Sequence, residues 1–283
     1  MAARSAAPSA CPAPARVKRL AARLRDVSVL TVRNFVHVRR EPLRLSDVTI
    51  QPVLFTLLFV YVFGAGVTLP GGGSYTAFAI PGLLALNLTT SSIGTAVGLC
   101  TDLASGVIDR FRTLAMWPAA VLVARSLADL LTAMLCTAVV AVVGLIVGWS
   151  PNGGALSTLG GFGVFLLFGY ALSWVCACVG LFAGDAESAQ GMGLIVLFPL
   201  SFVSNALVAT QHMPAVLRAI ADYNPVSAVT AASRDLFGNP NPSAQIHAWP
   251  MQHPALASVL WSVGLLVVFA PLAVHMYQRR TAD

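Results

Sequence analysis

The amino-acid sequence predicts an all-α, polytopic membrane protein with six transmembrane helices. Of its 283 residues, 57% are hydrophobic and 10% are charged, and the mean hydropathy is +0.78. Soluble domains carry about 25% charged residues, so this composition excludes an ordinary soluble domain. The apolar residues also form segments near or above the roughly 20 residues that a helix needs to cross a bilayer.

The chain divides into a short N-terminal tail and one membrane domain. Residues 1–25 are rich in Ala, Pro, Ser and Arg, and such a segment cannot bury enough apolar surface to fold alone, so we expect a disordered cytoplasmic tail. The membrane domain, 26–283, opens with an amphipathic helix over 27–45. Its polar face carries Arg33, His37 and Arg40, which is typical of a helix lying in the membrane interface.

Cutting the sequence at its charged residues leaves six apolar segments. We place the spans at 48–69, 75–99, 126–148, 159–183, 191–210 and 255–277. The second carries Asn87, Thr90 and Ser91 at mid-depth, and the fifth ends near Ser204 and Asn205. Polar groups inside a bilayer must find partners, so these five residues either bond neighbouring helices or line a translocation path.

Basic residues predict the orientation of the chain. Ten of them precede the first span, three lie in the central loop and two in the C-terminal tail, whereas the other side has only Arg218 and Arg234. This bias places both termini and the central loop in the cytoplasm and the protein in the cell membrane. The net charge of +6 then reflects topology and anionic lipids, and we expect no nucleic-acid partner.

The central loop, 100–125, carries charges between two apolar spans. It predicts a short amphipathic helix that Asp102 precedes as N-cap. One interpretation is an ordinary solvated loop, and the other is a docking element for a soluble partner. The residues that would carry the docking are Asp102, Gly106, Asp109, Arg110, Phe111, Arg112 and Leu114.

Asp129 is the acid that lies well inside a predicted span. A charge at this depth is costly and therefore a functional candidate, yet at four residues from Arg125 it can also form a structural ion pair. The five cysteines are interpreted as small buried hydrophobes, and no metal site is expected. His247 and His253 share one external loop and are the alternative metal ligands.

Two short helices are expected between the fifth and sixth spans. They begin at Pro214 and Pro225, and the second ends near Gly238, because proline favours the first helical turn and glycine the residue after the last. Neither is long enough to cross a bilayer, so they form a re-entrant or external pair. Arg218 and Asp222, four residues apart, are expected to pair within the first.

Two stretches resemble one protein family. The run DRFRTL at 109–114 is similar to the DRFRSL stretch of drug-exporting permeases of the type-2 ABC transporter family, the daunorubicin-resistance group. The run 198–240 resembles the same group through FPLSFVSN at 198–205, Pro214, Asn224-Pro225 and Arg234. The resemblance covers about 27–280 and departs from the group's pattern at 115–118 and in a polar insert at 239–253.

The resemblance implies the permease subunit of an ATP-driven exporter of a hydrophobic or amphipathic compound, such as an antibiotic or a lipid. It implies a homodimer or heterodimer that binds two copies of a cytoplasmic ATPase through the central loop and the interfacial helix. The sequence has no G-x-x-x-x-G-K-[ST] motif, so the chain is expected to be no enzyme, with ATP and Mg²⁺ bound by the partner. Lipid or glycolipid flipping, a proton-coupled carrier and an intramembrane enzyme are the alternatives.

The charge bias makes a prediction about topology. Cysteines introduced at Gly72 and Asn241 should react with an impermeant thiol reagent added outside intact cells, because both positions lie on the basic-poor side. A cysteine introduced at Arg112 should stay unlabelled until the cells are opened. External labelling at Arg112 would overturn both the orientation and the docking interpretation of the loop.

Overall fold

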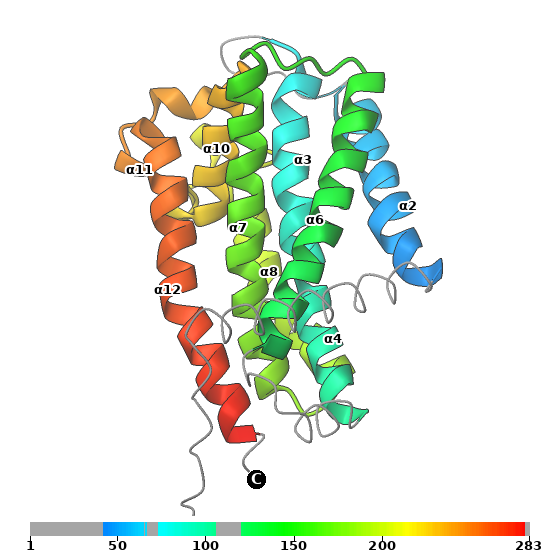
Figure 1. Ribbon diagram of the computed structural model, residues 1–283. Helices are drawn as coiled ribbons and strands as arrows, with labels where there is room; N and C mark the ends of the chain where they lie inside the picture. The colour runs from blue at the N-terminus through cyan, green and yellow to red at the C-terminus, as the bar shows by residue number, and fades with distance from the viewer. Residues whose placement is uncertain (1–41, 65, 67–72, 106–119, 281–283) are drawn as a thin grey trace, which may run out of the picture.

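The computed structural model is a bundle of helices, and it describes residues 42–64, 66, 73–105 and 120–280 (Figure 1). The longer helices are α2 (Pro42–Leu58), α3 (Tyr75–Ser91), α4 (Ile93–Ala104), α6 (Ala120–Ile146), α7 (Ala155–Phe182), α8 (Ala186–Phe202) and α12 (Pro254–Arg280). The shorter ones are η1 (Phe59–Phe63), η2 (Thr210–His212), α9 (Ala215–Tyr223), α10 (Pro225–Phe237), η3 (Pro242–Gln245) and α11 (Trp249–Gln252). The all-helical prediction is confirmed for these residues. The expected interfacial helix lies mostly outside them.

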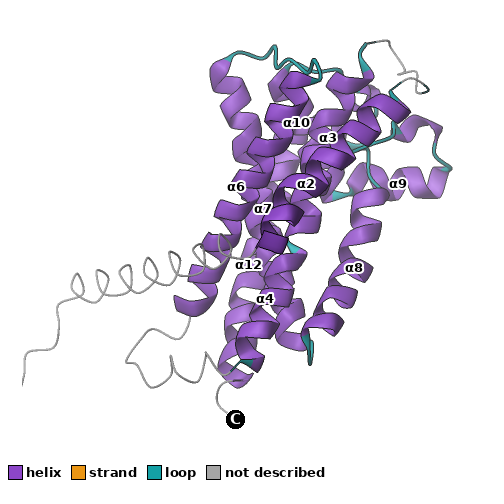
Figure 2. Ribbon diagram, turned by 90° about the vertical axis from the view of Figure 1, so that its right-hand side faces the viewer, coloured by secondary structure: helices purple, strands orange, loops and turns teal. Residues whose placement is uncertain are grey.

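Helix α7 is the centre of the bundle. It packs against α3, α4, α6, α8, α10 and α12, and Figure 1 shows it between α12 and α6. A helix that is apolar all round belongs inside a bundle, and Phe165, Phe168 and Leu172 of α7 are fully buried. Figure 2 shows α8 at the side of the bundle, where it packs against α4 and α3, whereas α2 packs against α6 and α3.

The two ends of the bundle are tied by different sets of contacts. At one end, Arg280 of α12 donates to the carbonyl of Ala183 at 3.0 Å, and the thiol of Cys100 lies 4.0 Å from the same oxygen. At the other end, Trp149 Nε1 donates to Asn239 Oδ1 at 2.9 Å. The end of α4 and the end of α10 therefore lie at opposite ends of the bundle, as the predicted topology requires.

Four of the described helical segments are long and apolar enough to cross a bilayer. They are Tyr75–Ala104, Leu122–Ile146, Ala155–Phe182 and Pro254–Arg280. These match the predicted second, third, fourth and sixth spans, with the third beginning earlier than expected. The apolar helix Thr49–Phe63 is shorter, so six membrane spans remain a prediction.

The predicted end of the fifth span, at residue 210, is wrong. Helix α8 has 17 residues and ends at Phe202, which gives a length of about 25 Å. Val203 leaves the helical conformation, with φ −87° and ψ 60°. The Asn224 amide donates to the carbonyls of Leu200 and Val203, both at 2.7 Å, and so satisfies two carbonyls that the end of α8 leaves free.

Helices α9 and α10 occupy the two segments where short helices were expected. Pro225 is in the first turn of α10, and Gly238, with φ +66°, ends it in the left-handed region that glycine adopts without strain. The expected Arg218–Asp222 pair is not formed. Asp222 instead accepts from Thr210 Oγ1 at 3.1 Å, while Arg218 donates to the carbonyls of Gln211 and Met213, which precede α9. That α9 and α10 form a re-entrant or external helix pair remains a prediction.

Arg234 of α10 is fully buried and clamps three parts of the chain. Its Nε and Nη2 donate to the carbonyl of Phe78 in α3, at 3.1 and 3.0 Å, and Nη2 also donates to the carbonyl of Ala206, after α8, at 2.9 Å. The guanidinium lies 3.7 Å from the centre of the Phe78 ring. Burial lowers the pKa of Arg234 to about 9, so the group is still a cation at neutral pH. These bonds and the cation–π contact offset part of its desolvation.

The Arg234 clamp also depends on a glycine. A Cβ on Gly82 of α3 would lie 1.7 Å from the carbonyl oxygen of Ala206, so only glycine lets α3 approach the turn after α8 this closely. This approach brings the carbonyls of Phe78 and Ala206 within reach of one guanidinium.

The Arg234 clamp predicts that replacing Arg234 destabilises the protein much more than the same replacement at Arg218. Arg234→Lys should lower the free energy of unfolding by about 2 kcal/mol or more, because lysine cannot donate along both directions and leaves buried carbonyls unsatisfied. Arg218→Lys is the matched control, since its carbonyl partners are exposed, and should change stability by less than about 0.5 kcal/mol. Reversible denaturation in mixed micelles measures both. Equal stability of the two variants would contradict the structural role of Arg234.

Candidate functional site

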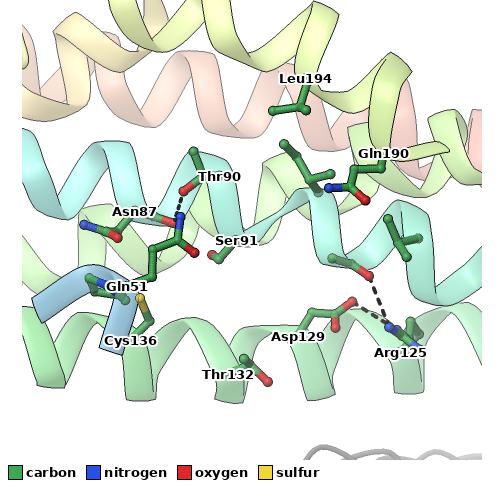
Figure 3. Close-up of a pocket in the computed structure, with 14 residues that line it drawn as sticks. Gln51, Asn87, Thr90, Ser91, Arg125, Asp129, Thr132, Cys136, Gln190 and Leu194 are labelled. Atoms are coloured by element: carbon green, nitrogen blue, oxygen red, sulfur yellow. Dashed lines mark hydrogen bonds and ion pairs between the residues drawn. The ribbon is translucent and has the colours of Figure 1, made fainter. Parts of the chain in front are cut away.

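A pocket of about 410 Å³ lies between α2, α3, α4, α6 and α8 (Figure 3). Polar side chains from four of these helices reach its wall, although the helices are largely apolar. They include the amides of Gln51, Asn87 and Gln190 and, on α6, Asp129 and Thr132. Polar groups are costly in a membrane bundle and mark a candidate functional site where they gather.

Three residues predicted for the translocation path, Asn87, Thr90 and Ser91, lie together on this wall. Each donates to a backbone carbonyl three or four residues earlier in α3, over 2.8 to 3.0 Å. These donors therefore need no partner on a neighbouring helix. Their oxygen lone pairs remain able to accept a hydrogen bond from a molecule in the pocket.

The predicted second span is broken at Ser92, beside the pocket. The carbonyl of Leu88 accepts from the hydroxyls of Ser91 and Ser92, at 3.0 and 2.9 Å, and from the Ser92 N–H at 3.2 Å. Hydroxyls that bond back to the helix in this way compete with its regular hydrogen bonds and bend it. The break lies between the lining residues of α3 and those of α4, which are Ile93, Gly94 and Val97.

Arg125 of α6 forms the most polar part of the wall. Its Nη1 donates to Asp102 Oδ2 at 3.1 Å, its Nε to Asp129 Oδ2 at 3.4 Å, and its Nη2 to the carbonyl of Gly94 at 3.3 Å. The residue is only 9% exposed. The Arg125–Asp129 pair is the one that their four-residue spacing predicted, whereas the Asp102 partner was not anticipated.

Gly98 on α4 makes room for this guanidinium. A Cβ on Gly98 would lie 1.6 Å from Arg125 Nη2, so any side chain there would displace the arginine. Gly94, Gly98 and Asp102 are spaced by four residues and share one face of α4. That spacing, next to an arginine on the following span, is the sequence signal that could have revealed the site.

Asp102 is not the N-cap that was expected, while its predicted docking role stays a prediction. Helix α4 continues to Ala104, so Asp102 lies in its last turn and is not the N-cap of a later helix. Its partner, Arg125, lies on the far side of the central loop, so the ion pair joins the two helices that flank the loop. The other docking and interfacial candidates lie outside the described residues. These are Gly106, Asp109, Arg110, Phe111, Arg112, Leu114, Arg33, His37 and Arg40.

Ser204 and Asn205 do not line this pocket. They follow α8 and are 2% and 1% exposed. The Asn205 N–H donates to Ser227 Oγ at 2.9 Å and its amide to Ser243 Oγ at 2.8 Å. These bonds hold the turn after α8 against α10 and the following loop.

The remaining motif residues build the same end of the bundle. Asn224 is the N-cap of α10, since its Oδ1 accepts from the Val226 N–H at 2.8 Å. Pro214 precedes α9 and Pro225 begins α10. His253 lies edge-on to Trp249, with ring centres 5.8 Å apart, and the described part of the chain contains no group of three potential metal-ligating side chains.

Gln51, Thr132 and Gln190 are pocket residues that the sequence analysis missed. Each is one of several polar residues in its helix, and no spacing distinguishes it from the others. Only the packing of α2, α6 and α8 around the α3–α4 break brings them to one wall.

Comparisons with known proteins agree with this arrangement. The family model described as ABC-2 type transporter matches residues 25–237, which include every helix around the pocket. The chain is 34% identical over 241 residues to the "Daunorubicin resistance ABC transporter permease protein DrrB1" of Streptomyces coeruleorubidus, covering 85% of this chain and 82% of that protein. It is 26% identical over 239 residues to the "Probable doxorubicin resistance ABC transporter permease protein DrrC" of Mycobacterium tuberculosis, covering 83% and 82%. A bundle of apolar helices around a polar pocket, matched by this family over most of its length, identifies the chain as a member of the ABC-2 type transporter family.

Proposed function

We propose that this chain is the membrane permease subunit of an ATP-driven exporter of hydrophobic or amphipathic compounds. The observation that carries the proposal is the polar pocket and its link to the central loop through the Arg125–Asp102 pair, 3.1 Å long. Membership of the family and the names of two relatives, which include daunorubicin and doxorubicin resistance, support export of a drug-like compound.

The Arg125–Asp102 pair is the proposed route of coupling. A force on the loop would move the last turn of α4, and with it Asp102, relative to α6. Arg125 would then change its hold on Asp129, which lines the pocket. The break at Ser92 would let α4 move while α3 stays clamped to α10 by Arg234.

The size of the pocket favours a small-molecule cargo. Its volume of about 410 Å³ falls within the roughly 300 to 1,000 Å³ usual for small-molecule sites. Flipping of a lipid or glycolipid by the same class of permease is the second candidate. A proton-coupled carrier needs intramembrane carboxylates along a path, and Asp129 is instead held by Arg125.

The proposed assembly pairs this chain with a second permease chain, identical or similar, and with two copies of a cytoplasmic ATPase that binds ATP and Mg²⁺. The central loop and the interfacial helix, with Arg33, His37 and Arg40, would contact the ATPase. Both termini would be cytoplasmic in the cell membrane, as the charge bias of the sequence predicts.

Reversing the charges of the central loop tests docking. Arg110→Glu with Arg112→Glu should leave expression and insertion near normal while co-purification of the ATPase and drug export fall. The glutamates would face an acidic surface of the ATPase, and like charges at an interface cost several kcal/mol. Arg279→Glu, an exposed change in the last turn of α12, is the control and should leave both unchanged. The chain purified alone should hydrolyse no ATP. Full export by the double variant would contradict docking and show that the charges of the central loop only face solvent.

Removing the charge of Asp102 tests coupling separately from docking. Asp102→Asn should leave the ATPase bound but lower export about fivefold or more, because a neutral amide accepts a weaker bond from Arg125. Asp185→Asn is the matched control at the same end of the bundle, since asparagine caps α8 as well as aspartate does. Unchanged export by Asp102→Asn, or loss of the ATPase from the complex, would contradict the coupling route.

A further inference from the structure

Helix α2 runs directly into a π-helical turn. This turn, η1, covers Phe59–Phe63, and the N–H groups of a π-helix bond to carbonyls five residues earlier rather than four. Such a turn therefore holds one residue more than the α-helical turn that it replaces, and single π turns inside helices are frequent at functional sites. Here the turn follows the part of α2 that carries Gln51 and Pro52, which line the pocket (Figure 3).

The end of the helix beyond η1 is held against α3. Val60 is 7% exposed and packs in the core together with residues of α3. The Gly64 N–H donates to the carbonyl of Val60 at 3.1 Å, and a Cβ on Gly64 would lie 3.5 Å from Tyr75 in the first turn of α3. Because Arg234 holds the carbonyl of Phe78 in the next turn of α3, this end of α2 is anchored.

The pocket-lining part of α2 has one free face. It packs against α6 and α3, whereas Ile50, Leu54 and Leu58 on the opposite face are between 48% and 60% exposed. In a bilayer this face meets lipid, whose tails are as apolar as leucine. A turn of this part about its own axis therefore exchanges one lipid contact for another on that face.

Converting the π turn to an α turn would advance this part by one residue relative to the anchored end. It would rotate by about 100° and shift by about 1.5 Å along its axis. Every position on the helix surface would then pass to the next residue in the chain. Val53 would take the place of Pro52 in the pocket wall, Pro52 that of Gln51, and Gln51 that of Ile50 on the lipid face.

The residues of α2 suit both registers. Thr56 is fully buried, and its hydroxyl donates to the carbonyl of Pro52 at 2.7 Å in the same helix, so the hydroxyl keeps its partner wherever the helix turns. Leu57, which would replace Thr56 in the buried position, is apolar. Gln51 lies two residues from the start of the apolar helix Thr49–Phe63, where a side-chain amide can reach the polar headgroup region.

We propose that η1 is a register switch of α2, and that its conversion to an α turn withdraws the Gln51 amide from the pocket wall and brings Val53 into it. Gly64 is the positioning residue of the switch. A Cβ there would overlap the carbonyl oxygen of Val60, so any other residue disfavours the π turn. The switch gives the pocket two walls of different polarity, and its use in export rests on the proposed function.

A spin label on the isolated chain in lipid nanodiscs tests the register. With the native cysteines replaced by alanine, the label is placed at Gln51→Cys or at Val53→Cys. Its accessibility is measured to oxygen, which concentrates in lipid, and to a water-soluble nickel chelate. Gly64→Ala should raise the oxygen-to-nickel ratio at position 51, which turns to lipid, and lower it at position 53, which enters the pocket. General unfolding would instead change both ratios in the same direction.

Gly66→Ala is the matched control, because a Cβ on Gly66 meets no atom within 4 Å, and it should leave both ratios unchanged. Removing Tyr61, which is 67% exposed, takes out the extra residue of the π turn and should keep Gln51 in the pocket wall. Removing Tyr61 in the Gly64→Ala chain should therefore restore both ratios. Unchanged ratios in Gly64→Ala, or no restoration by the deletion, would overturn the proposal.

Hydrogen exchange provides a second measurement that does not depend on the folding of Gly64→Ala. The amides of 59–64 should exchange faster in the unmodified chain than in the chain without Tyr61, because only the former opens this turn during conversion. Equal exchange would overturn the proposal. None of these measurements uses the ATPase. A chain that switches register but recruits no ATPase would refute the proposed function alone, whereas a chain that exports while both labels stay fixed would refute the switch alone.

Discussion

The buried guanidinium of Arg234 is the interaction on which the arrangement of the helices depends. Burying a charged group is costly unless hydrogen bonds offset its desolvation. The bonds from Nε and Nη2 of Arg234 to the carbonyls of Phe78 and Ala206 hold α10, α3 and the turn after α8 in one geometry, while its Nη1 has no hydrogen-bond partner. Because α10 also packs on α7 and α12, this one group joins the centre of the bundle to α3, the helix that carries Asn87, Thr90 and Ser91 of the pocket.

A second arginine, Arg125, has the opposite character. It is also largely buried, but its partners are two carboxylates and one carbonyl at the edge of a cavity. Arg234 ties α10 to α3 and to the turn after α8, whereas Arg125 joins α6 to the last turn of α4. Ser92 lies between the two regions, since it separates α3 from α4.

Sequence reasoning was most accurate where local chemistry decides the outcome. Pro225 and Gly238 bound α10, and the spacing of Arg125 and Asp129 produced the expected pair. It was less accurate where partners distant in the chain compete for the backbone. Helix α8 ends eight residues before the predicted end of the fifth span, where Asn224 bonds the carbonyls of Leu200 and Val203. Asp102 lies in the last turn of α4 and pairs with Arg125, which is 23 residues further along the chain.

The sequence by itself determined the helical membrane class, most of the long apolar helices and the family, because hydrophobic length and local motifs are properties of contiguous residues. Only the tertiary structure decided which polar residues share a wall. Asn87, Thr90 and Ser91 meet Gln51, Asp129 and Gln190 there, whereas Ser204 and Asn205 turn to a different set of partners. The physical reason is that polar side chains in an apolar helix look alike in sequence, and their roles depend on which helix packs against them.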